Sequence, residues 1–379
     1  MKATLYNKKR PVMVLDIENG VVMQIEEVLD TDFLPVVFQD DPTVESVNQW
    51  LSKRMMPENR EGLKRARELF PAFDQKQKRN LFSLNDQYWV KYTKNESWDR
   101  LNYFTNRYGE ETGKVFFLPW KVDEDALKKE QSPDITTNGV LTKRWIQDEF
   151  KDSHLIKAGS ALFQQEPVSE VMASIVLDRL KIIPFVRYEM LVYGLRFCSK
   201  CKNFVTKDTE FVPASYLYKK EPKKDNESVY EHLTRMCANY KIKNVHGYVN
   251  AMIAADYIMG NKDRHLGNFG FLRNVETGEF EGFAPLFDSG SAFWNDARRK
   301  GKDGKPRKSF FAEYERSAVA QVSSRIDAKK VCEKDELYRL VDTYPCLTDK
   351  KRRMVREEID RMSSILEQPI EDPIEELSR

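Results

Sequence analysis

The chain has 379 residues, of which 41% are hydrophobic and 32% are charged, and its formal net charge is +2. This composition is typical of a globular protein with two or three packed units, and it excludes a largely disordered chain. A net charge so close to zero gives no overall electrostatic attraction to nucleic acid or to a membrane surface.

We expect neither a secretory signal nor a membrane-spanning segment in this sequence. The N-terminal stretch MKATLYNKKRPVMVLD has neither a continuous apolar core nor a small-residue cleavage site, which excludes a secretory signal. No apolar run reaches the roughly eighteen residues of a membrane-spanning helix, so we expect no membrane span. An odd number of cysteines in a long, charged chain favours a reduced, cytoplasmic location; they are Cys198, Cys201, Cys237, Cys332 and Cys346.

Residues 1–130 are expected to form a small α+β accessory subdomain. Residues 2–28 alternate apolar and polar side chains around Asn19-Gly20, which predicts a β-hairpin. Asp41 before Pro42 predicts the N-cap of a helix, and a basic helix is expected over 59–70. The aromatic residues of 80–120 indicate core or inter-domain packing.

Residues 131–220 read as a β-rich lobe and residues 221–379 as a helical lobe. A strand over 154–157 ends on a lysine, a helix follows over 168–180, and 184–197 and 203–218 are rich in strand-forming residues. The apolar spacing of 245–259 predicts a buried helix that ends at Gly260, and a final helix is expected over 348–367. The predicted fold class is therefore α+β, with two lobes arranged as in protein kinases.

Two short stretches carry side chains suited to phosphoryl transfer. Asp263-Arg-His-Leu-Gly-Asn268 supplies a carboxylate and a carboxamide, and Asp288-Ser-Gly290 supplies a second carboxylate before a glycine. Transfer from a nucleotide needs one Asp to orient the attacking hydroxyl, and oxygen ligands for the magnesium that bridges the phosphates. A capped loop in which Asp263 accepts backbone amides is the structural alternative.

A kinase also needs a lysine for the nucleotide phosphates and often an acidic residue that holds this lysine. Lys157 ends an apolar strand and suits the first role, and Glu170 on the next helix suits the second. Each residue alone is weak evidence, because strand lysines and helix glutamates are usually solvated. Their order before the Asp and Asn residues is the sequential layout of protein-kinase-like enzymes.

Together these motifs resemble the HipA-like serine/threonine protein kinases over about 130–365, and the phosphoinositide kinases use a similar Asp-Arg-His-x-x-Asn loop. The resemblance implies an ATP- and Mg²⁺-dependent kinase that transfers phosphate to a protein. It implies that Asp263 is the catalytic aspartate, that Asn268 and Asp288 bind Mg²⁺, and that Lys157 contacts the α- and β-phosphates. His265 would brace the catalytic loop or touch phosphate.

The nucleotide-covering loop and the adenine hinge match the family less well. Thr136, Thr137, Asn138 and Gly139 stand in place of the phosphate loop but include a single glycine. Their amides and hydroxyls would grip phosphate, and Thr136 or Thr137 would be the autophosphorylation site by resemblance; an ordinary β-turn is the alternative. The best candidate for the adenine-contacting hinge is the segment 210–213, in which Glu210 and Val212 would contact adenine.

Two alternatives for the function remain open from the sequence. The acceptor could be a lipid or small-molecule hydroxyl, or the chain could be a regulatory pseudokinase that binds nucleotide without turnover. The basic run 298–308 could dock an acidic protein, a nucleic acid or an anionic lipid head group, or it could be a solvated loop. Cys198 and Cys201 lack the further ligands of a zinc site and are interpreted as two thiols in a hairpin.

The family resemblance also indicates the partners. It implies ATP, a protein substrate and a toxin–antitoxin role with a small DNA-binding, antitoxin-like partner. The chain has no recognisable DNA-reading motif, so we expect no direct nucleic acid binding.

Overall fold

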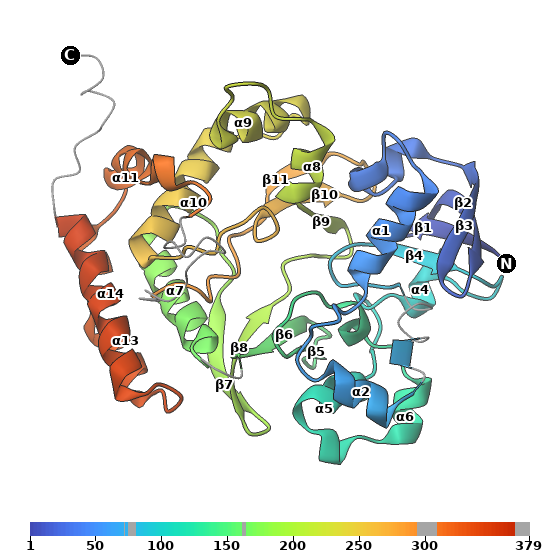
Figure 1. The fold of residues 1–379 in the computed structure, drawn as a ribbon, viewed down its shortest axis with the longest axis horizontal. Coiled ribbons are helices and arrows are strands. Elements are labelled where there is room, and N and C mark those ends of the chain that lie inside the picture. The colour runs from blue at the N-terminus through green and yellow to red at the C-terminus, as the bar shows by residue number, and fades with distance from the viewer. Residues whose placement is uncertain (72, 75–80, 161–163, 294–308, 368–379) are drawn as a thin grey trace. The chain divides into compact units, whose positions relative to one another are not determined.

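The computed structural model describes residues 1–71, 73–74, 81–160, 164–293 and 309–367 (Figure 1). The chain divides into two compact units that interleave along the sequence. Unit 1 comprises Met1–Ala158, Val192–Val212 and Phe271–Glu281, and unit 2 comprises Gly159–Leu191, Pro213–Gly270 and Gly282–Arg379. The basic run 298–308 lies outside the described residues.

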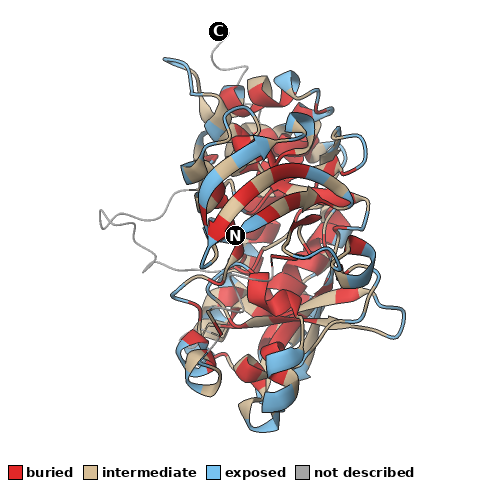
Figure 2. Ribbon diagram, turned by 90° about the vertical axis from the view of Figure 1, so that its right-hand side faces the viewer, coloured by how far each residue is buried: buried red, intermediate tan, exposed pale blue. Residues whose placement is uncertain are grey.

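The N-terminal part of unit 1 is an antiparallel sheet with the strand order β3-β2-β1-β4. Its strands are β1 (Lys2–Asn7), β2 (Arg10–Glu18), β3 (Val21–Val28) and β4 (Tyr88–Lys91). Asn19 and Gly20 join β2 to β3 with φ angles of 51° and 78°, the left-handed pair of a type I′ turn, so the predicted hairpin is confirmed. Buried and less buried residues alternate along β1 and along most of β2 (Figure 2).

Helix α1 (Val44–Arg54) packs on β3, and its N-terminus differs from the prediction. Thr43 is the N-cap instead of Asp41, because its hydroxyl accepts the Ser46 amide at 3.1 Å while the Ser46 hydroxyl accepts the Thr43 amide at 3.0 Å. This reciprocal capping box satisfies two amides, which Asp41 could not do from two residues earlier.

The other strands that the structure describes form two further sheets. One has the order β5-β6-β8-β7 and the other the order β11-β10-β9. The first is built from β5 (Lys143–Gln147), β6 (Ser153–Ala158), β7 (Tyr188–Tyr193) and β8 (Arg196–Lys202), and the second from β9 (Thr209–Pro213), β10 (Gly270–Asn274) and β11 (Phe280–Phe283). The predicted strand over 154–157 is β6, and it pairs with β5 and β8 on its two sides.

Short helices and aromatic side chains complete unit 1. The α-helices are α2 (Leu63–Leu69), α4 (Trp98–Leu101), α5 (Glu111–Phe117) and α6 (Glu124–Lys129), and the 3₁₀ turns are η1 (Thr31–Phe33), η2 (Val36–Phe38), η3 (Pro119–Lys121) and η4 (Pro133–Thr136). The basic helix predicted over 59–70 is α2, which begins later than expected. Phe82, Trp89, Trp98 and Tyr103 form a buried cluster, which confirms the packing role for these residues, whereas Trp120 is exposed.

Unit 2 is largely helical, and α10 forms its core. Its elements are α7 (Glu166–Leu180), α8 (Ala214–Lys220), α9 (Val229–Asn239), α10 (Val245–Met259), η5 (Ala312–Tyr314), α11 (Glu315–Ser323), α12 (Ala328–Val331), α13 (Asp335–Thr343) and α14 (Asp349–Glu367). Helix α10 contacts α7, α11 and α14 and is buried on nearly all sides (Figure 1). The predicted helices over 245–259 and 348–367 are confirmed. The strand-rich segment predicted over 203–218 is wrong for 214–218, which is helical because Ala214 and Leu217 bury one helical face.

The chain organisation differs from the three consecutive ranges expected from the sequence. Residues 1–130 do not form a separate subdomain, because hydrogen bonds join them to later segments of the chain within unit 1. Arg273 of β10 donates to the Asp32 carbonyl at 2.5 Å, and the Gln87 amide donates to the Thr206 carbonyl at 2.8 Å. Buried backbone carbonyls need such partners, which commits the segments 192–212 and 271–281 to unit 1.

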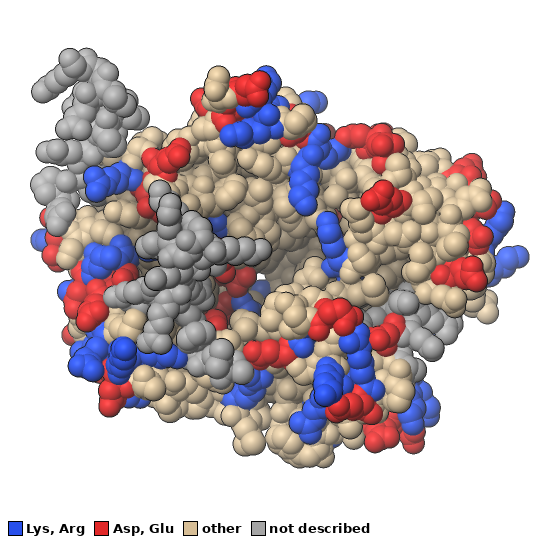
Figure 3. Space-filling model, in the orientation of Figure 1, with Lys and Arg blue, Asp and Glu red and all other residues tan. Residues whose placement is uncertain are grey.

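Acidic and basic side chains are interspersed over the face drawn in Figure 3, in keeping with the small net charge. None of the helices in the described part of the chain combines the length and apolarity needed to cross a bilayer.

Candidate active site

The first predicted catalytic loop follows α10 directly. Gly260 ends the helix with a φ of 67°, a left-handed conformation that suits glycine. Asp263 is partly exposed, and its amide donates to the Asn261 side chain at 3.3 Å. The Asn268 side-chain amide donates to the Asp263 carbonyl at 3.2 Å, and the Asn268 main-chain amide donates to the His265 carbonyl at 2.8 Å. The loop is thus closed on itself from Asp263 to Asn268.

The second predicted loop places Asp288 in a left-handed conformation, with a φ of 57°. Its amide donates to the Tyr188 hydroxyl at 3.3 Å. Ser289 and Gly290 are buried, and a Cβ added at Gly290 would lie 3.6 Å from a carboxylate oxygen of Glu170. Glu170 of α7 is itself buried, so its side chain lies against the backbone that follows Asp288.

A buried arginine connects the two loops. Both oxygens of Asp256 accept from Arg264, Oδ2 from Nε at 2.8 Å and Oδ1 from Nη2 at 3.0 Å. Nη1 donates to the carbonyls of Asn268 at 2.8 Å and Phe287 at 2.5 Å, and Nη2 also donates to the Ser289 hydroxyl at 3.2 Å. Burial opposes the charge of Arg264, but the Asp256 carboxylate outweighs it and raises the pKa of the guanidinium above its usual value.

His265 is exposed, and its Nδ1 accepts the Gly267 amide at 3.1 Å. A ring nitrogen that accepts a hydrogen bond carries no proton, so this contact requires the proton on Nε2 when the ring is neutral. The contact lies within the loop. The bracing role predicted for His265 stays a prediction.

Lys157 lies on β6 in unit 1, where its backbone is paired with Lys143 and Ser199. The residue is buried, with 7% of its surface exposed. A buried lysine is rare without a charged or polar function for its amine, which distinguishes Lys157 from the usual solvated strand lysine. Its predicted contact with nucleotide phosphates stays a prediction.

The threonines of the expected phosphate loop are turned inward. The Thr136 hydroxyl donates to the Phe82 carbonyl at 2.7 Å, and the Thr137 hydroxyl donates to the Pro133 carbonyl at 2.8 Å while accepting from Trp145 Nε1 at 3.0 Å. Both residues are buried, because η4 begins at Pro133 and draws them into the core. In this conformation neither hydroxyl is presented to a phosphate, in contrast to the expectation from the sequence.

Asn138 and Gly139 follow on the surface. Gly139 has a φ of 95°, which favours glycine at this turn. The exposed part of the predicted phosphate loop is therefore limited to these two residues, and their contact with phosphate stays a prediction.

Glu210 and Val212 of the predicted hinge lie on β9, and the second segment of unit 1 ends at Val212. The Glu210 side chain is buried and forms an ion pair with Arg273 at 3.0 Å. Burial raises the pKa of Glu210 to about 7, although Arg273 opposes the shift. The Glu210 side chain is therefore committed to the interior of unit 1, and an adenine contact at this position would use the backbone.

The chemistry of the donor set fits magnesium. Mg²⁺ prefers carboxylate and carboxamide oxygens and is commonly held by one or two carboxylates together with substrate phosphates. Asn268 and Asp288 supply such oxygens from two loops that share the Arg264 guanidinium. Among the described residues, no group of three or more His, Cys, Asp or Glu is arranged to hold a metal.

Cys198 and Cys201 lie on β8, a strand of the β7–β8 hairpin, and both are buried free thiols. Burial raises the pKa of the Cys198 thiol to about 11. Because the thiolate is the reactive and metal-binding form, this shift favours an inert thiol.

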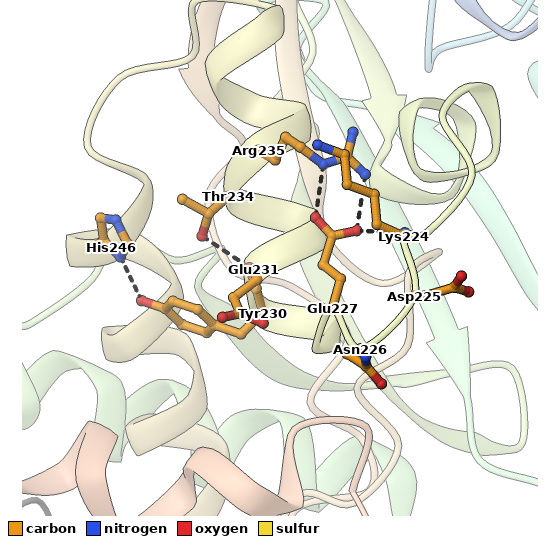
Figure 4. Close-up of a pocket in the computed structure, with 9 residues that line it drawn as sticks. All are labelled: Lys224, Asp225, Asn226, Glu227, Tyr230, Glu231, Thr234, Arg235 and His246. Carbon is orange, nitrogen blue, oxygen red and sulfur yellow. Dashed lines mark hydrogen bonds and ion pairs between the residues drawn. The ribbon is translucent and has the colours of Figure 1, made fainter.

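A pocket of about 510 Å³ lies along α9 in unit 2 (Figure 4). Its walls include Lys224, Glu227, Tyr230 and His246, and none of the predicted site residues lines it. Arg235 donates to both oxygens of Glu227 at 2.7 and 2.9 Å, so the central charges of the pocket neutralise each other. The pocket is separate in sequence from the loops of Asp263 and Asp288.

Sequence reasoning missed Arg264, Asp256 and Tyr188. Asp256 had a detectable signal, since it is the only carboxylate in the mostly apolar stretch 245–259, and a charge in a buried helix usually has a partner. The acceptors of Arg264 could not be read from the sequence, because Phe287 and Ser289 lie more than twenty residues away.

The mixed α+β architecture and these loops define a kinase-like fold. None of the protein-family models compared matches the chain. A crystal structure of a Shewanella oneidensis HipA–HipB–operator DNA complex matches it with a TM-score of 0.55 and 12% identity, over 96% of each chain. The chain therefore has the fold of the HipA-like kinases, and the predicted resemblance is confirmed at the level of the fold.

Two further matches involve Helicobacter pylori proteins. The serine/threonine-protein kinase CtkA of strain J99 is 48% identical over 46 residues, which are 12% of this chain and 14% of that relative's length. The crystal structure of the proinflammatory kinase CtkA covers 59% of this chain and 90% of its own, at 19% identity and a TM-score of 0.45.

Proposed function

We propose that this chain is an ATP- and Mg²⁺-dependent kinase that transfers the γ-phosphate to a serine or threonine hydroxyl of a protein. The observation that carries the proposal is the shared Arg264 guanidinium, which ties the Asp263–Asn268 loop to the segment around Asp288. Phosphoryl transfer depends on positioning and charge neutralisation, and fixed loops with oxygen donors supply both.

Each residue has a proposed task. Asp263 is partly exposed and would accept a hydrogen bond from the acceptor hydroxyl, which orients the oxygen for attack. Asn268 and Asp288 would hold Mg²⁺, which when bound neutralises the charge on the phosphates. Lys157 would contact the nucleotide phosphates, and Glu170 is the acidic residue proposed to support this lysine.

The identity of the acceptor is the finer part of the proposal. A protein hydroxyl is favoured by the local 48% identity to a protein named as a serine/threonine-protein kinase. Autophosphorylation at Thr136 or Thr137 would require η4 to open, because both hydroxyls are buried and hydrogen-bonded.

A small DNA-binding partner and a cytoplasmic setting are also proposed. The Shewanella structure contains HipA with HipB and operator DNA, which motivates the search for an antitoxin-like partner of this chain. The five cysteines are all free thiols, which suits a reducing compartment.

The proposal is tested by incubating the protein with γ-labelled ATP, Mg²⁺ and two acceptor sets, a mixture of unfolded proteins and vesicles that contain phosphoinositides. We expect label on protein serine or threonine with the wild type and none with Asp288→Ala, while Asp335→Ala, which removes an exposed carboxylate of α13, behaves as the wild type. Label on lipid alone would identify a lipid kinase. Nucleotide binding without transfer to either acceptor would identify a pseudokinase.

A further inference from the structure

The Arg264 side chain is saturated with hydrogen bonds. An arginine has five N–H donors, and all five are accounted for by acceptors in unit 2. Nε and Nη2 bind the two Asp256 oxygens, Nη2 also binds Ser289, and Nη1 binds the carbonyls of Asn268 and Phe287. Only 2% of the side chain is exposed, so water does not compete for these donors.

Two of these contacts bracket Asp288. Phe287 precedes it and accepts through its carbonyl, and Ser289 follows it and accepts through its hydroxyl. Asp288 itself has a φ of 57°, a conformation that costs free energy for a residue with a Cβ and persists where its surroundings fix it. The guanidinium holds both neighbours and so fixes the direction in which the Asp288 carboxylate leaves the backbone.

The same guanidinium holds the other proposed metal ligand. It binds the Asn268 carbonyl, and Arg264 itself directly follows Asp263 in the chain. One rigid, planar group therefore sets the separation between the backbones of Asn268 and Asp288. A lysine could not do so, because its ammonium has three donors at a single atom.

Asp256 keeps this group charged and oriented. Its two oxygens accept a fork of two N–H groups, and its Oδ1 also accepts the Asn261 side-chain amide at 2.7 Å. Asn261 in turn accepts the Asp263 amide. Asp256 is part of the buried helix α10, so the anchor of the whole arrangement is the core of unit 2.

We propose that Arg264 is a positioning residue that sets the spacing of the two magnesium ligands, Asn268 and Asp288, and thereby sets the affinity of the protein for Mg²⁺. This proposal rests on the proposed function. Residues that orient metal ligands commonly change metal affinity about 10- to 100-fold when they are replaced.

The experiment is a Mg²⁺ titration of the binding of a fluorescent ATP analogue to the full chain. For Arg264→Lys we expect the apparent Mg²⁺ dissociation constant to rise about 10- to 100-fold, while binding of the analogue in excess EDTA stays as in the wild type. The matched control is Arg361→Lys, since Arg361 also donates to carbonyls of α10, those of Tyr257 and Ile258, but contacts neither loop. The control is expected to keep the wild-type Mg²⁺ constant.

An unchanged Mg²⁺ constant in folded Arg264→Lys overturns the proposal. If that variant does not fold, the same titration is made with Ser289→Ala, which removes only the hydrogen bond from Arg264 Nη2 to the Ser289 hydroxyl. A raised apparent Mg²⁺ dissociation constant in this variant supports the proposal, and a wild-type constant overturns it. A wild type that binds Mg²⁺ and nucleotide but transfers no phosphate overturns the proposed function alone. A wild type whose nucleotide binding is independent of Mg²⁺ overturns both.

Discussion

A buried arginine–carboxylate pair in unit 1 and another in unit 2 differ in how completely they are hydrogen-bonded. In unit 2, Arg264 Nε lies 2.8 Å from Asp256 Oδ2, and the two side chains are 2% and 8% exposed. In unit 1, Arg273 Nη1 lies 3.0 Å from Glu210 Oε1, and both side chains are 3% exposed. Burial and distance are thus nearly equal. Asp256 accepts hydrogen bonds at both oxygens, whereas Glu210 Oε2 has no hydrogen-bond partner among the residues that the structure describes.

This difference changes what each pair can do. Burial raises the pKa of Glu210 to about 7, and the carboxylate of Asp86 adds to the shift while Arg273 opposes it. Glu210 can therefore exchange its proton near neutral pH. Arg264, by contrast, is hydrogen-bonded at every donor, and the Asp256 carboxylate raises the pKa of its guanidinium against the effect of burial. A buried ion pair fixes a site when its hydrogen bonds are complete and becomes sensitive to pH when they are not.

The largest effect on stability is expected from Asp256→Asn. The carboxamide has nearly the same shape but no charge, so Arg264 would be left as an uncompensated buried cation. Breaking such a pair from one side costs about 3–5 kcal/mol of unfolding free energy. Denaturant unfolding of the variant and the wild type measures the loss, and a cost below about 1 kcal/mol would show that the pair does not hold the two loops.

A smaller, pH-dependent effect is expected from Glu210→Gln. The pKa of Glu210 rises from about 4.5 in the unfolded chain to about 7 in the fold, so the folded state binds more protons between these values. Its contribution to stability is therefore complete below pH 4.5 and falls as pH rises to about 7, by at most about 3 kcal/mol. The variant cannot ionise and should lose this part of the pH dependence.

The measurement is unfolding free energy from pH 4.5 to pH 8. Burial also raises the pKa of Asp134 to about 7, so a residual pH dependence of the same sign is expected in the variant. Glu276→Gln is the matched control, because Glu276 is 62% exposed in its ion pair with Lys8. Identical pH profiles for Glu210→Gln and the wild type would contradict the assignment.

Thr137→Val tests whether the expected phosphate loop is structural. The substitution removes a hydroxyl that serves the Pro133 carbonyl and Trp145 Nε1, and a buried unsatisfied group costs about 1–3 kcal/mol. We expect lower stability with unchanged nucleotide affinity, measured by unfolding and by ATP-analogue binding. Asn138→Ala, at the exposed neighbour, should keep wild-type stability. Weaker nucleotide binding by a fully stable Thr137→Val would instead place its hydroxyl on the phosphate.

The smallest effect is expected from Asp178→Asn. Arg187 Nη2 lies 2.6 Å from Asp178 Oδ1, a shorter distance than in either buried pair, but both side chains are more than half exposed. Solvent screening limits such a pair to at most about 1 kcal/mol. Denaturant unfolding should therefore give a value near that of the wild type. A loss comparable to that of Asp256→Asn would mean that burial is not what separates these pairs.

Local signals in the sequence were sufficient for several elements. The Asn19-Gly20 pair predicts the hairpin turn, because few other pairs of residues place two left-handed conformations in succession. Helix α10 is predicted by the helical spacing of its apolar residues up to Gly260. The candidate loops around Asp263 and Asp288 are likewise predicted from residues that are adjacent in the chain, and their catalytic role stays a prediction.

Features that depend on distant partners could not be predicted. The sequence of 134–139 is that of a polar turn, and nothing local shows that Thr136 and Thr137 would bond to Phe82 and Pro133. The role of Arg264 likewise depends on carbonyls brought close by the fold. The carbonyl of any residue can accept a hydrogen bond, so its use leaves no trace in the sequence.

The central claim is that the loops joined by Arg264 catalyse phosphate transfer. Its most direct test is the rate of transfer from γ-labelled ATP in Mg²⁺, with the modified residue mapped by mass spectrometry, for the wild type, Asp263→Ala and the control Asp335→Ala. The account predicts label on serine or threonine with the wild type and the control, and a rate at least about 10³-fold lower with Asp263→Ala. Equal rates in the wild type and Asp263→Ala, with both proteins folded, would contradict it.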